Sequence, residues 1–265
     1  MEKEKLYVIK IGGSLIDNEE NLSKFLAVFA GIKFKKILVH GGGKLATEMA
    51  KNLNIPQELN NGRRITSKET LDIVTMVYAG KINKNIVVKL QNFHCNAMGF
   101  SGADGNLIKA EKREISDIDY GFVGDVEAES INFQLLESLL DLNLVPVFSA
   151  ITHDQKGQLF NTNADSIASV LAQALSQNYN VELLYCFDRN GVLENPEDSA
   201  SVIKTLIIQK YEELKASQKL TEGILPKLKN AFLAKENQVA KVFLMNESNL
   251  QNHINQENDG TQIKI

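Results

Sequence analysis

The chain has 265 residues, of which 43% are hydrophobic and 23% are charged, as in a globular protein with a sizeable buried core. The formal net charge of −4 argues against a general nucleic-acid binder. No apolar run approaches the roughly 20 residues of a membrane span, and Met1 to Lys5 lack the apolar core of a signal peptide. Cys95 and Cys186 lack metal-like spacing, so we expect reduced thiols in a cytoplasmic protein.

Apolar runs and helical patterns alternate along the chain. Strands are predicted at residues 5–11, 36–40, 144–151, 182–187 and 240–245. Helices are predicted at residues 20–31, 44–53, 67–92, 164–178 and 224–236. This alternation predicts an α/β fold with a mostly parallel sheet covered on both faces. Short turn-rich segments between about 93 and 128 predict hairpins, and residues 260–265 predict a turn and a terminal strand.

Two glycine loops follow the first two predicted strands. The first runs from Lys10 to Ser14 (KIGGS) and the second from His40 to Lys44 (HGGGK). Each precedes a helical pattern, so each places bare backbone N–H groups and a helix N-terminus where an anion can bind. The loops therefore predict an enzyme that handles a phosphate group.

Three phosphate-binding motifs compete for these loops. Residues 41–46 (GGGKLA) fit the dinucleotide fingerprint G-x-G-x-x-A, but this lone motif leaves Gly12 and Gly13 unexplained. A P-loop needs Ser or Thr after the lysine and a glycine at position 38; Leu45 follows Lys44, and position 38 is not glycine. The third possibility is a kinase in which both loops converge on a transferred phosphoryl group.

Seven motifs occur in an order that resembles the N-acetylglutamate kinases of the amino acid kinase family. They are KIGGS at 10–14, HGGG at 40–43, NGRRIT at 61–66, GKINK at 80–84, GFVGD at 121–125, NTNAD at 161–165 and GILPK at 223–227. The resemblance covers nearly the whole chain from about residue 5. It implies a three-layer αβα sandwich with a mainly parallel central sheet. It also implies an N-terminal lobe (1–178) for acyl-amino-acid binding and dimerisation, and a C-terminal lobe (179–265) for ATP.

The resemblance implies three catalytic residues. Lys10 matches the lysine that contacts the phosphoryl oxygens, and Lys227 matches a second lysine near the ATP phosphates. A lysine in the first turn of a helix opposes the helix dipole, which favours a bound anion there. Asp165 matches the aspartate that holds both lysines, although its place at a helix start also suits an N-cap.

Substrate contacts are implied at the NGRRIT and NTNAD motifs. Arg64 matches the arginine that clamps the substrate carboxylate in a bidentate fork. Its neighbour Arg63 occupies a position that is usually apolar in the family, and we assign it to the solvated surface. Asn161 matches the asparagine that hydrogen-bonds the α-carboxylate or amide of the substrate.

Backbone groups complete the implied site. Gly42 and Gly43 would bring N–H groups to the γ-carboxylate and the transferred phosphate, and Gly12 and Gly13 would do the same for the β- and γ-phosphates of ATP.

Asp188 stands in a strand-end loop near the expected nucleotide, where Phe187 replaces the threonine more usual in the family. No carboxylate cluster suits a protein-held metal, so we expect Mg²⁺ to arrive with ATP.

The resemblance predicts ATP-dependent phosphorylation of the γ-carboxylate of N-acetyl-L-glutamate, the second step of arginine synthesis. The same reaction on another N-acyl glutamate, such as N-succinylglutamate, or on a carrier-linked substrate stays open. Two functions from other classes are a dinucleotide-binding oxidoreductase, which rests on residues 41–46 alone, and a catalytically silent amino-acid sensor. The presence of Lys10, Asp165 and Lys227 together argues against the sensor.

Assembly is predicted from two segments. Feedback-inhibited family members carry an extra N-terminal helix that links dimers into a hexamer, whereas only Met1 to Lys5 precede the first strand here. We therefore expect a homodimer that arginine does not inhibit. The amphipathic stretch from Thr66 to about Gln91, interrupted at Gly80, is the expected two-fold contact.

Overall fold

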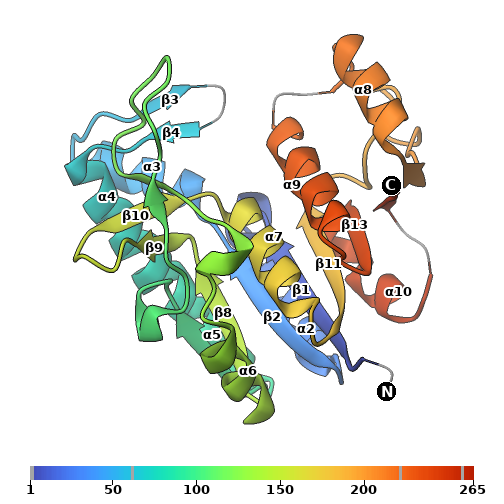
Figure 1. Ribbon diagram of the computed structural model, residues 1–265, viewed down its shortest axis with the longest axis horizontal. Coiled ribbons are helices and arrows are strands. Elements are labelled where there is room, and N and C mark those ends of the chain that lie inside the picture. The colour runs from blue at the N-terminus through green and yellow to red at the C-terminus, as the bar shows by residue number, and fades with distance from the viewer. Residues whose placement is uncertain (1–2, 61–62, 221–222, 258–259) are drawn as a thin grey trace.

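A central eight-stranded sheet organises the computed structural model, which describes residues 3–60, 63–220, 223–257 and 260–265 (Figure 1). In spatial order the strands are β12 (Thr205–Leu206), β14 (Thr261–Ile263), β13 (Lys241–Asn246), β11 (Asn180–Phe187), β1 (Lys5–Ile11), β2 (Lys35–His40), β8 (Val145–Ser149) and β5 (Ala97–Phe100). Only the β13–β14 pair is antiparallel among these neighbours. The predicted mainly parallel sheet is confirmed.

The central strands are apolar on both faces because helices cover both. Every residue of β1 from Leu6 to Ile11 is buried, and so is β11 from Val181 to Phe187. Continuous apolar runs of this kind are typical of parallel strands sandwiched between helices. Because β1 pairs with β11 on one side and with β2 on the other, the sheet is continuous across residues 178–179.

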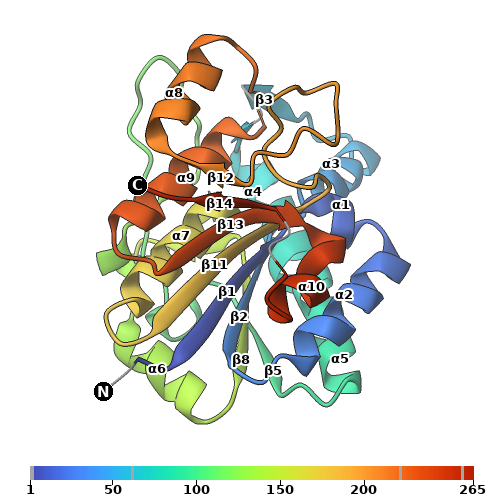
Figure 2. The same ribbon diagram turned by 90° about the vertical axis from the view of Figure 1, so that its right-hand side faces the viewer.

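Helices form the two outer layers (Figure 2). One face carries α1 (Gly13–Ile16), α2 (Glu19–Gly31), α5 (Asn83–Asn92) and α10 (Leu250–Ile254). The other face carries α6 (Phe133–Asp141), α7 (Ala164–Leu175) and α9 (Leu225–Glu236). All residues of α7 except Ser166 are buried, because the helix lies between the sheet and α9. The three-layer αβα sandwich is confirmed.

The helix predicted over 67–92 is continuous but not uniform. It consists of α4 (Lys68–Thr75), a π-helical segment (Met76–Ile82) and α5. The π segment contains Gly80, where the interruption was predicted, and π turns inside helices recur at functional sites.

Two small sheets and a helix stand beyond the carboxyl ends of β1 and β2. One sheet has the order β6 (Glu111–Lys112), β7 (Val123–Asp125), β10 (Leu159–Thr162) and β9 (Ile151–His153). The other pairs β3 (Glu58–Asn60) with β4 (Arg63–Ile65), and α3 (Gly43–Asn52) lies beside it. The first two residues of the NGRRIT motif, Asn61 and Gly62, lie outside the described residues.

The hairpin prediction for residues 93–128 is confirmed only in part. The strands β6 and β7 form an antiparallel pair, whereas Ala97–Phe100 joins the main sheet parallel to β8. The sequence prediction also missed α6 and α8 (Ile208–Ala216). Short 3-10 segments complete the described elements at Asp104–Asn106, Ala128–Ser130 and Glu247–Asn249. Within the described ranges, no helix is both long and apolar enough to cross a membrane.

Candidate active site

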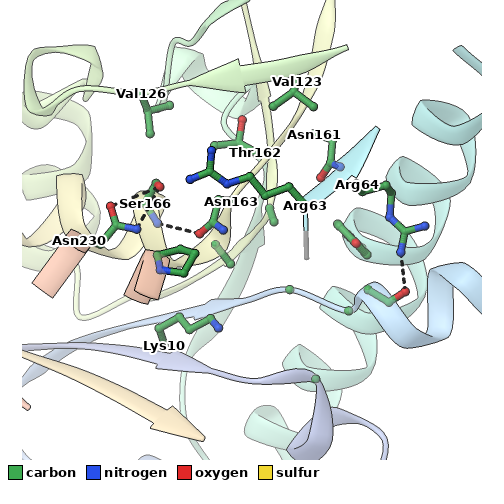
Figure 3. A pocket seen from close by; sticks show the side chains of 18 of the residues that line it. Lys10, Arg63, Arg64, Val123, Val126, Asn161, Thr162, Asn163, Ser166 and Asn230 are labelled. Carbon is green, nitrogen blue, oxygen red and sulfur yellow. Dashed lines mark hydrogen bonds between the residues drawn. The ribbon is translucent and has the colours of Figure 1, made fainter. Parts of the chain in front are cut away.

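A cleft of about 820 Å³ opens where β1 and β2 end and the small sheets begin. Both glycine loops contribute to its wall, as do β4, β7, β10 and the first turns of α7 and α9 (Figure 3). Ligands of open α/β sheets bind outside the carboxyl ends of the strands. The cleft therefore lies where the fold predicts a small-molecule site.

Asp165 joins the two predicted lysines. Its Oδ2 accepts a hydrogen bond of 2.8 Å from Lys227 Nζ, and Lys10 Nζ lies 2.8 Å from Oδ1 as an ion pair. Lys10 is the second-last residue of β1, Asp165 is in the first turn of α7, and Lys227 is in the first turn of α9. The structure thus brings together three residues separated by up to 217 positions in the numbering of the sequence.

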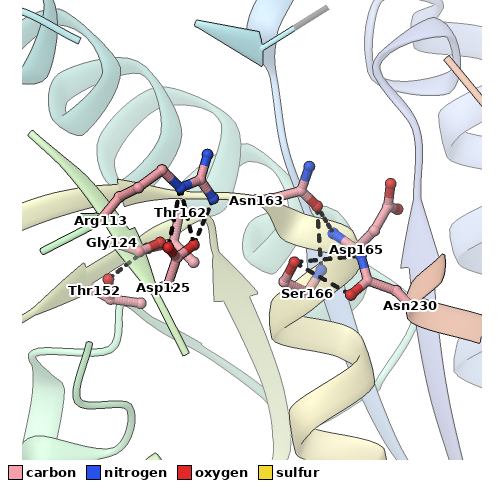
Figure 4. Close-up of polar contacts among 9 residues, drawn as sticks. All are labelled: Arg113, Gly124, Asp125, Thr152, Thr162, Asn163, Asp165, Ser166 and Asn230. Carbon is pink, nitrogen blue, oxygen red and sulfur yellow. Dashed lines mark hydrogen bonds and ion pairs between the residues drawn. The ribbon is translucent and has the colours of Figure 1, made fainter. Parts of the chain in front are cut away.

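The N-terminus of α7 is capped by a different residue. The side-chain oxygen of Asn163 accepts hydrogen bonds from the backbone N–H groups of Asp165 and Ser166, at 2.8 and 3.1 Å (Figure 4). Asp165 is therefore not the N-cap, the alternative role considered above, and its carboxylate is left for the lysines. Tyr185 anchors the same turn by donating its hydroxyl to the backbone oxygen of Asp165, at 3.1 Å.

The cluster carries a net positive charge in a buried place. Lys10 is 9% exposed and Asp165 is 7% exposed, and two ammonium groups face one carboxylate. Burial alone would raise the pKa of Asp165, but Lys10 and Lys227 outweigh it and hold that pKa well below its usual range. Burial lowers the pKa of Lys10, against the pull of Asp165. An uncompensated buried cation at a cleft is costly unless an anion binds beside it.

The second glycine loop needs glycine at one position. Gly42 has a φ of +153°, and a Cβ there would overlap the side chain of Ile82 in the π-helical segment. Gly43 begins α3, and both glycines line the cleft. His40, just before them, is fully buried with Nε2 3.1 Å from Asn83 Nδ2. Burial lowers its pKa to about 4, so it is neutral at pH 7.

The first glycine loop is open to the cleft. Gly12 is the N-cap of the single-turn α1, and Gly13 begins that helix. Gly13 lines the cleft, and a Cβ there would meet nothing within 4 Å among the described residues. Its backbone is therefore accessible to a ligand.

Arg64 is held in place by neutral partners. Its Nη2 donates to the carbonyl oxygen of Gly43 and to Oγ1 of Thr47, both at 2.8 Å, and its Nη1 donates to Oε1 of Gln57. In the described part of the chain no carboxylate lies within ion-pair distance of it. A positioned guanidinium without a protein anion suits a carboxylate of the substrate.

Asn161 faces the same cleft from β10. Its Nδ2 donates to Oγ1 of Thr66 at 3.0 Å, which leaves the carboxamide oxygen to accept a hydrogen bond from a ligand. Its strand neighbour is Val123 of β7, which also lines the cleft. The polar amide and the apolar valine therefore stand side by side.

Two arginines in the cleft wall were not predicted as site residues. Arg63 was assigned to the solvated surface; it is exposed, but its side chain lies on the cleft wall and points inward (Figure 3). Arg113 also lines the cleft, and its Nε donates to both carboxylate oxygens of Asp125, at 3.0 and 3.2 Å (Figure 4). Arg63 belongs to the NGRRIT motif and Arg113 precedes the GFVGD motif, but neither motif specifies the direction of these side chains.

Asp188 and Lys227 are not on the cleft wall. Asp188 follows β11, is exposed, and raises the pKa of Glu247 in addition to the larger effect of burial. The ammonium group of Lys227 binds Asp165, while Pro226 and Lys229, close to it in the sequence, line the cleft. Among the residues that the structure describes, no group of His, Cys, Asp or Glu is arranged to hold a metal ion.

The chain is similar to known proteins along nearly its whole length. A model of the Amino acid kinase family matches residues 5–246. The chain is 50% identical to a protein of Cytophaga hutchinsonii named acetylglutamate kinase, over 96% of each chain. It is 46% identical to a protein of Phocaeicola vulgatus with the same name, over 99% of each chain. Its fold is similar to that of smu.665 from Streptococcus mutans UA159, with a TM-score of 0.80, 24% identity and 98% of each chain covered.

Proposed function

This chain belongs to the amino acid kinase family, and we propose that it transfers the γ-phosphoryl group of ATP to the γ-carboxylate of N-acetyl-L-glutamate. That reaction is the second step of arginine biosynthesis. The full-length similarity to proteins named acetylglutamate kinase supports the substrate. The family membership leaves the dinucleotide motif at residues 41–46 without a role of its own.

The observation that carries the proposal is the buried cluster of Lys10, Asp165 and Lys227. Phosphoryl transfer moves negative charge from the γ-phosphoryl group to the leaving β-phosphate. In the cluster, Lys10 lines the cleft and would stabilise charge on the transferred phosphoryl group. Lys227 binds the other oxygen of the shared carboxylate and would stabilise charge on the leaving ADP. Asp165 keeps both ammonium groups in position, so no reorganisation is needed during the reaction.

No general base is required. The γ-carboxylate is already ionised near pH 7, so one of its oxygens attacks phosphorus directly while the bond to the bridging oxygen of ADP breaks. The chain's task is to hold two polyanions in line and to balance their charge. Gly42 and Gly43 offer backbone N–H groups to the γ-carboxylate and the transferred phosphate.

The acyl amino acid is proposed to lie across the N-terminal lobe. Arg64 binds its α-carboxylate with the N–H groups not used by Gly43, Thr47 and Gln57. Asn161 accepts the amide N–H of the substrate through its free carboxamide oxygen. The reacting end then points towards Lys10, because Arg64 and Lys10 stand at different parts of the same cleft.

ATP is proposed to bind over the C-terminal lobe, residues 179–265. Gly12 and Gly13 would cradle its β- and γ-phosphates, which suits their place at the start of α1. Asp188, in the loop after β11, would contact the nucleotide beyond them. Mg²⁺ carried by ATP would supply further charge neutralisation on the phosphate oxygens.

A homodimeric assembly and a cytoplasmic location are further parts of the proposal. Met76 and Val88 are apolar and 58% and 62% exposed along the π segment and α5. We propose that this helix forms the two-fold contact of a homodimer. Cys95 and Cys186 are both free thiols, which suits the reducing cytoplasm.

An assay of two products tests the reaction. With ATP, Mg²⁺ and N-acetyl-L-glutamate, the enzyme should release ADP and form an acyl phosphate that hydroxylamine traps as a hydroxamate, in equal amounts. Free L-glutamate should be a poor substrate because it lacks the amide that Asn161 recognises. ADP release without hydroxamate, or NAD(P) binding in place of ATP binding, would contradict the proposal.

A further inference from the structure

Arg63 is a cation in the cleft that the proposed reaction does not use. It stands on β4 next to Arg64, and its side chain points into the cleft (Figure 3). Unlike Arg113, which is matched by Asp125, Arg63 has no hydrogen bond or ion pair to any residue that the structure describes. The cleft wall therefore presents one unmatched guanidinium besides the carboxylate clamp.

The position of Arg63 relates it to the substrate amide. Thr66, three residues further along, hydrogen-bonds Asn161 and runs alongside residues 120–122. Val123, the strand partner of Asn161, continues that segment. Arg63, Asn161 and Val123 all line the cleft, and in Figure 3 they lie above Lys10, in the upper part of the view.

This part of the cleft is where the acyl group of the substrate must lie. If the reacting γ-carboxylate lies at the Lys10 end of the cleft, Arg64 binds the α-carboxylate and Asn161 binds the amide, the acyl chain extends along the wall that Val123 and Arg63 form. Val123 offers an apolar contact for methylene groups. Arg63 offers a fork of N–H donors beyond it, which matches the geometry of a carboxylate.

We infer that the acyl subsite is built for an acyl group that ends in a carboxylate, with Arg63 as the residue that recognises it. A four-carbon dicarboxylic acyl group, as in N-succinyl-L-glutamate, is the probe that fits this chemistry. The inference rests on the proposed function, because it assumes that the other parts of the substrate bind as described. Arg63 thereby sets specificity and takes no part in the transfer itself.

The alternative ligand of Arg63 is a phosphate group of ATP. The geometry favours the acyl group, because Lys10 and Lys227 are the cations proposed for the phosphates, and Figure 3 shows Lys10 apart from Arg63. The two roles differ in what they predict. A phosphate contact would affect every acyl substrate equally, whereas an acyl contact affects only those with a terminal charge.

The experiment compares three acyl groups on three proteins. The values of kcat/KM are measured for N-succinyl-, N-butyryl- and N-acetyl-L-glutamate with the native enzyme and with Arg63→Met, which keeps much of the length but removes the charge. N-Butyryl-L-glutamate has a chain of the same length as the succinyl compound without its carboxylate. Lys112→Met is the matched control, because Lys112 is an exposed cation on the neighbouring β6 that does not line the cleft.

The native enzyme should favour N-succinyl- over N-butyryl-L-glutamate by about tenfold, near the low end of the effect of a hydrogen bond between charged groups, because Arg63 is exposed. Arg63→Met should bring that ratio to about one and change the N-acetyl value less than threefold. Lys112→Met should leave the ratio unchanged. The native preference should also shrink at high salt, because exposed charges are screened.

Three results would overturn the inference: no native preference for the succinyl compound, a preference that survives Arg63→Met, or an equal loss for all three substrates with a raised KM for ATP. Loss of the preference in Lys112→Met would also overturn it, since the effect would then be long-range. If none of the three compounds is phosphorylated by the native enzyme, the proposed function fails instead, so the two failures are distinct.

Discussion

Asn163 and Asp165 have different roles at the N-terminus of α7: Asn163 caps the helix, and Asp165 binds two lysines. The side chain of Asn163 accepts the backbone N–H of Asp165 at 2.8 Å, so the helix is capped without the carboxylate. A carboxylate at this end of a helix is favoured by the helix dipole, and here it is also within 2.8 Å of two ammonium groups. The ionised form of Asp165 is therefore strongly stabilised.

Removing either lysine should damage the chemical step. We expect Lys10→Ala and Lys227→Ala each to lower kcat on the order of 10²–10³, by analogy with the loss of one preorganised donor. The KM values should change much less, because the lysines meet charge that develops during transfer. Steady-state kinetics with both substrates varied provides the measurement.

A matched control for these variants is Lys36→Met. Lys36 is also a buried lysine in a central strand, but its Nζ donates to the backbone oxygens of Ala30 and Ile32, outside the cleft. Its replacement should reduce thermal stability and leave kcat nearly intact. A loss confined to KM in the Lys10 or Lys227 variants would reject their assignment to the chemical step.

Arg64→Lys should weaken binding of the acyl amino acid. Lysine keeps the charge but has no planar fork, so it cannot hold Gly43, Thr47 and a carboxylate at once. We expect KM for N-acetyl-L-glutamate to rise on the order of tenfold or more, with KM for ATP nearly unchanged. The opposite pattern, a raised KM for ATP alone, would place Arg64 in the nucleotide site.

Gly42→Ala should disrupt the second glycine loop. Its φ of +153° is unfavourable for alanine, and the added Cβ overlaps Ile82. We expect a large loss of activity together with a fall in melting temperature. Gly80→Ala is the contrast: a Cβ at Gly80 meets nothing within 4 Å, and alanine favours the helix by about 0.5–1 kcal/mol. A Gly42→Ala enzyme with native activity and stability would contradict the assigned role of this loop.

The helix contact of the proposed homodimer is open to a simple test. Val88→Glu places a charge on the exposed apolar face of α5, which a two-fold contact would bury twice. Light scattering should show a dimer for the native enzyme and a monomer for the variant. Phe34→Glu is the control, since Phe34 is also apolar and 47% exposed but lies outside this helix. A dimer that persists in Val88→Glu would exclude this interface.

The sequence predicted the parts of the site that depend on local backbone. Both glycine loops, the helices after them and the central strands have strong local signals, because periodicity and glycine conformation are local properties. The helix α6 also had a signal: Asn132 caps it through its side chain. That cap precedes a short amphipathic run, which sequence analysis overlooked.

Side-chain direction was beyond the sequence. Arg63 was assigned to the solvated surface because its position is usually apolar in the family, yet both Arg63 and Arg64 line the cleft. Both belong to β4 of the two-stranded β3–β4 sheet, which was not predicted from the sequence and stands beside the cleft. Likewise, the local sequence left an N-cap role for Asp165 open, because its ion pairs with Lys10 and Lys227 are tertiary contacts.

A second buried carboxylate predicts how stability depends on pH. Glu182 is 5% exposed near the start of β11. Its Oε1 lies 3.1 Å from the ammonium groups of both Lys5 and Lys241, and its Oε2 lies 3.3 Å from Nε2 of His253. Burial alone would raise the pKa of Glu182, but the His253 contact and Lys5 outweigh it and lower the pKa to about 2.

The lowered pKa means that ionised Glu182 stabilises the folded chain at neutral pH. This contribution is present above the pKa of the unfolded chain, near 4.5, and is lost as the pH falls towards 2. Glu182→Gln should therefore lower the free energy of unfolding at pH 7, where it leaves two lysines without their partner. Chemical unfolding at pH 7, 4.5 and 3 should show the difference between native and variant shrinking as the pH falls, with Glu20→Gln, at an exposed i,i+4 pair, as the control. A difference that stays constant with pH would show that Glu182 acts through its shape and not through its charge.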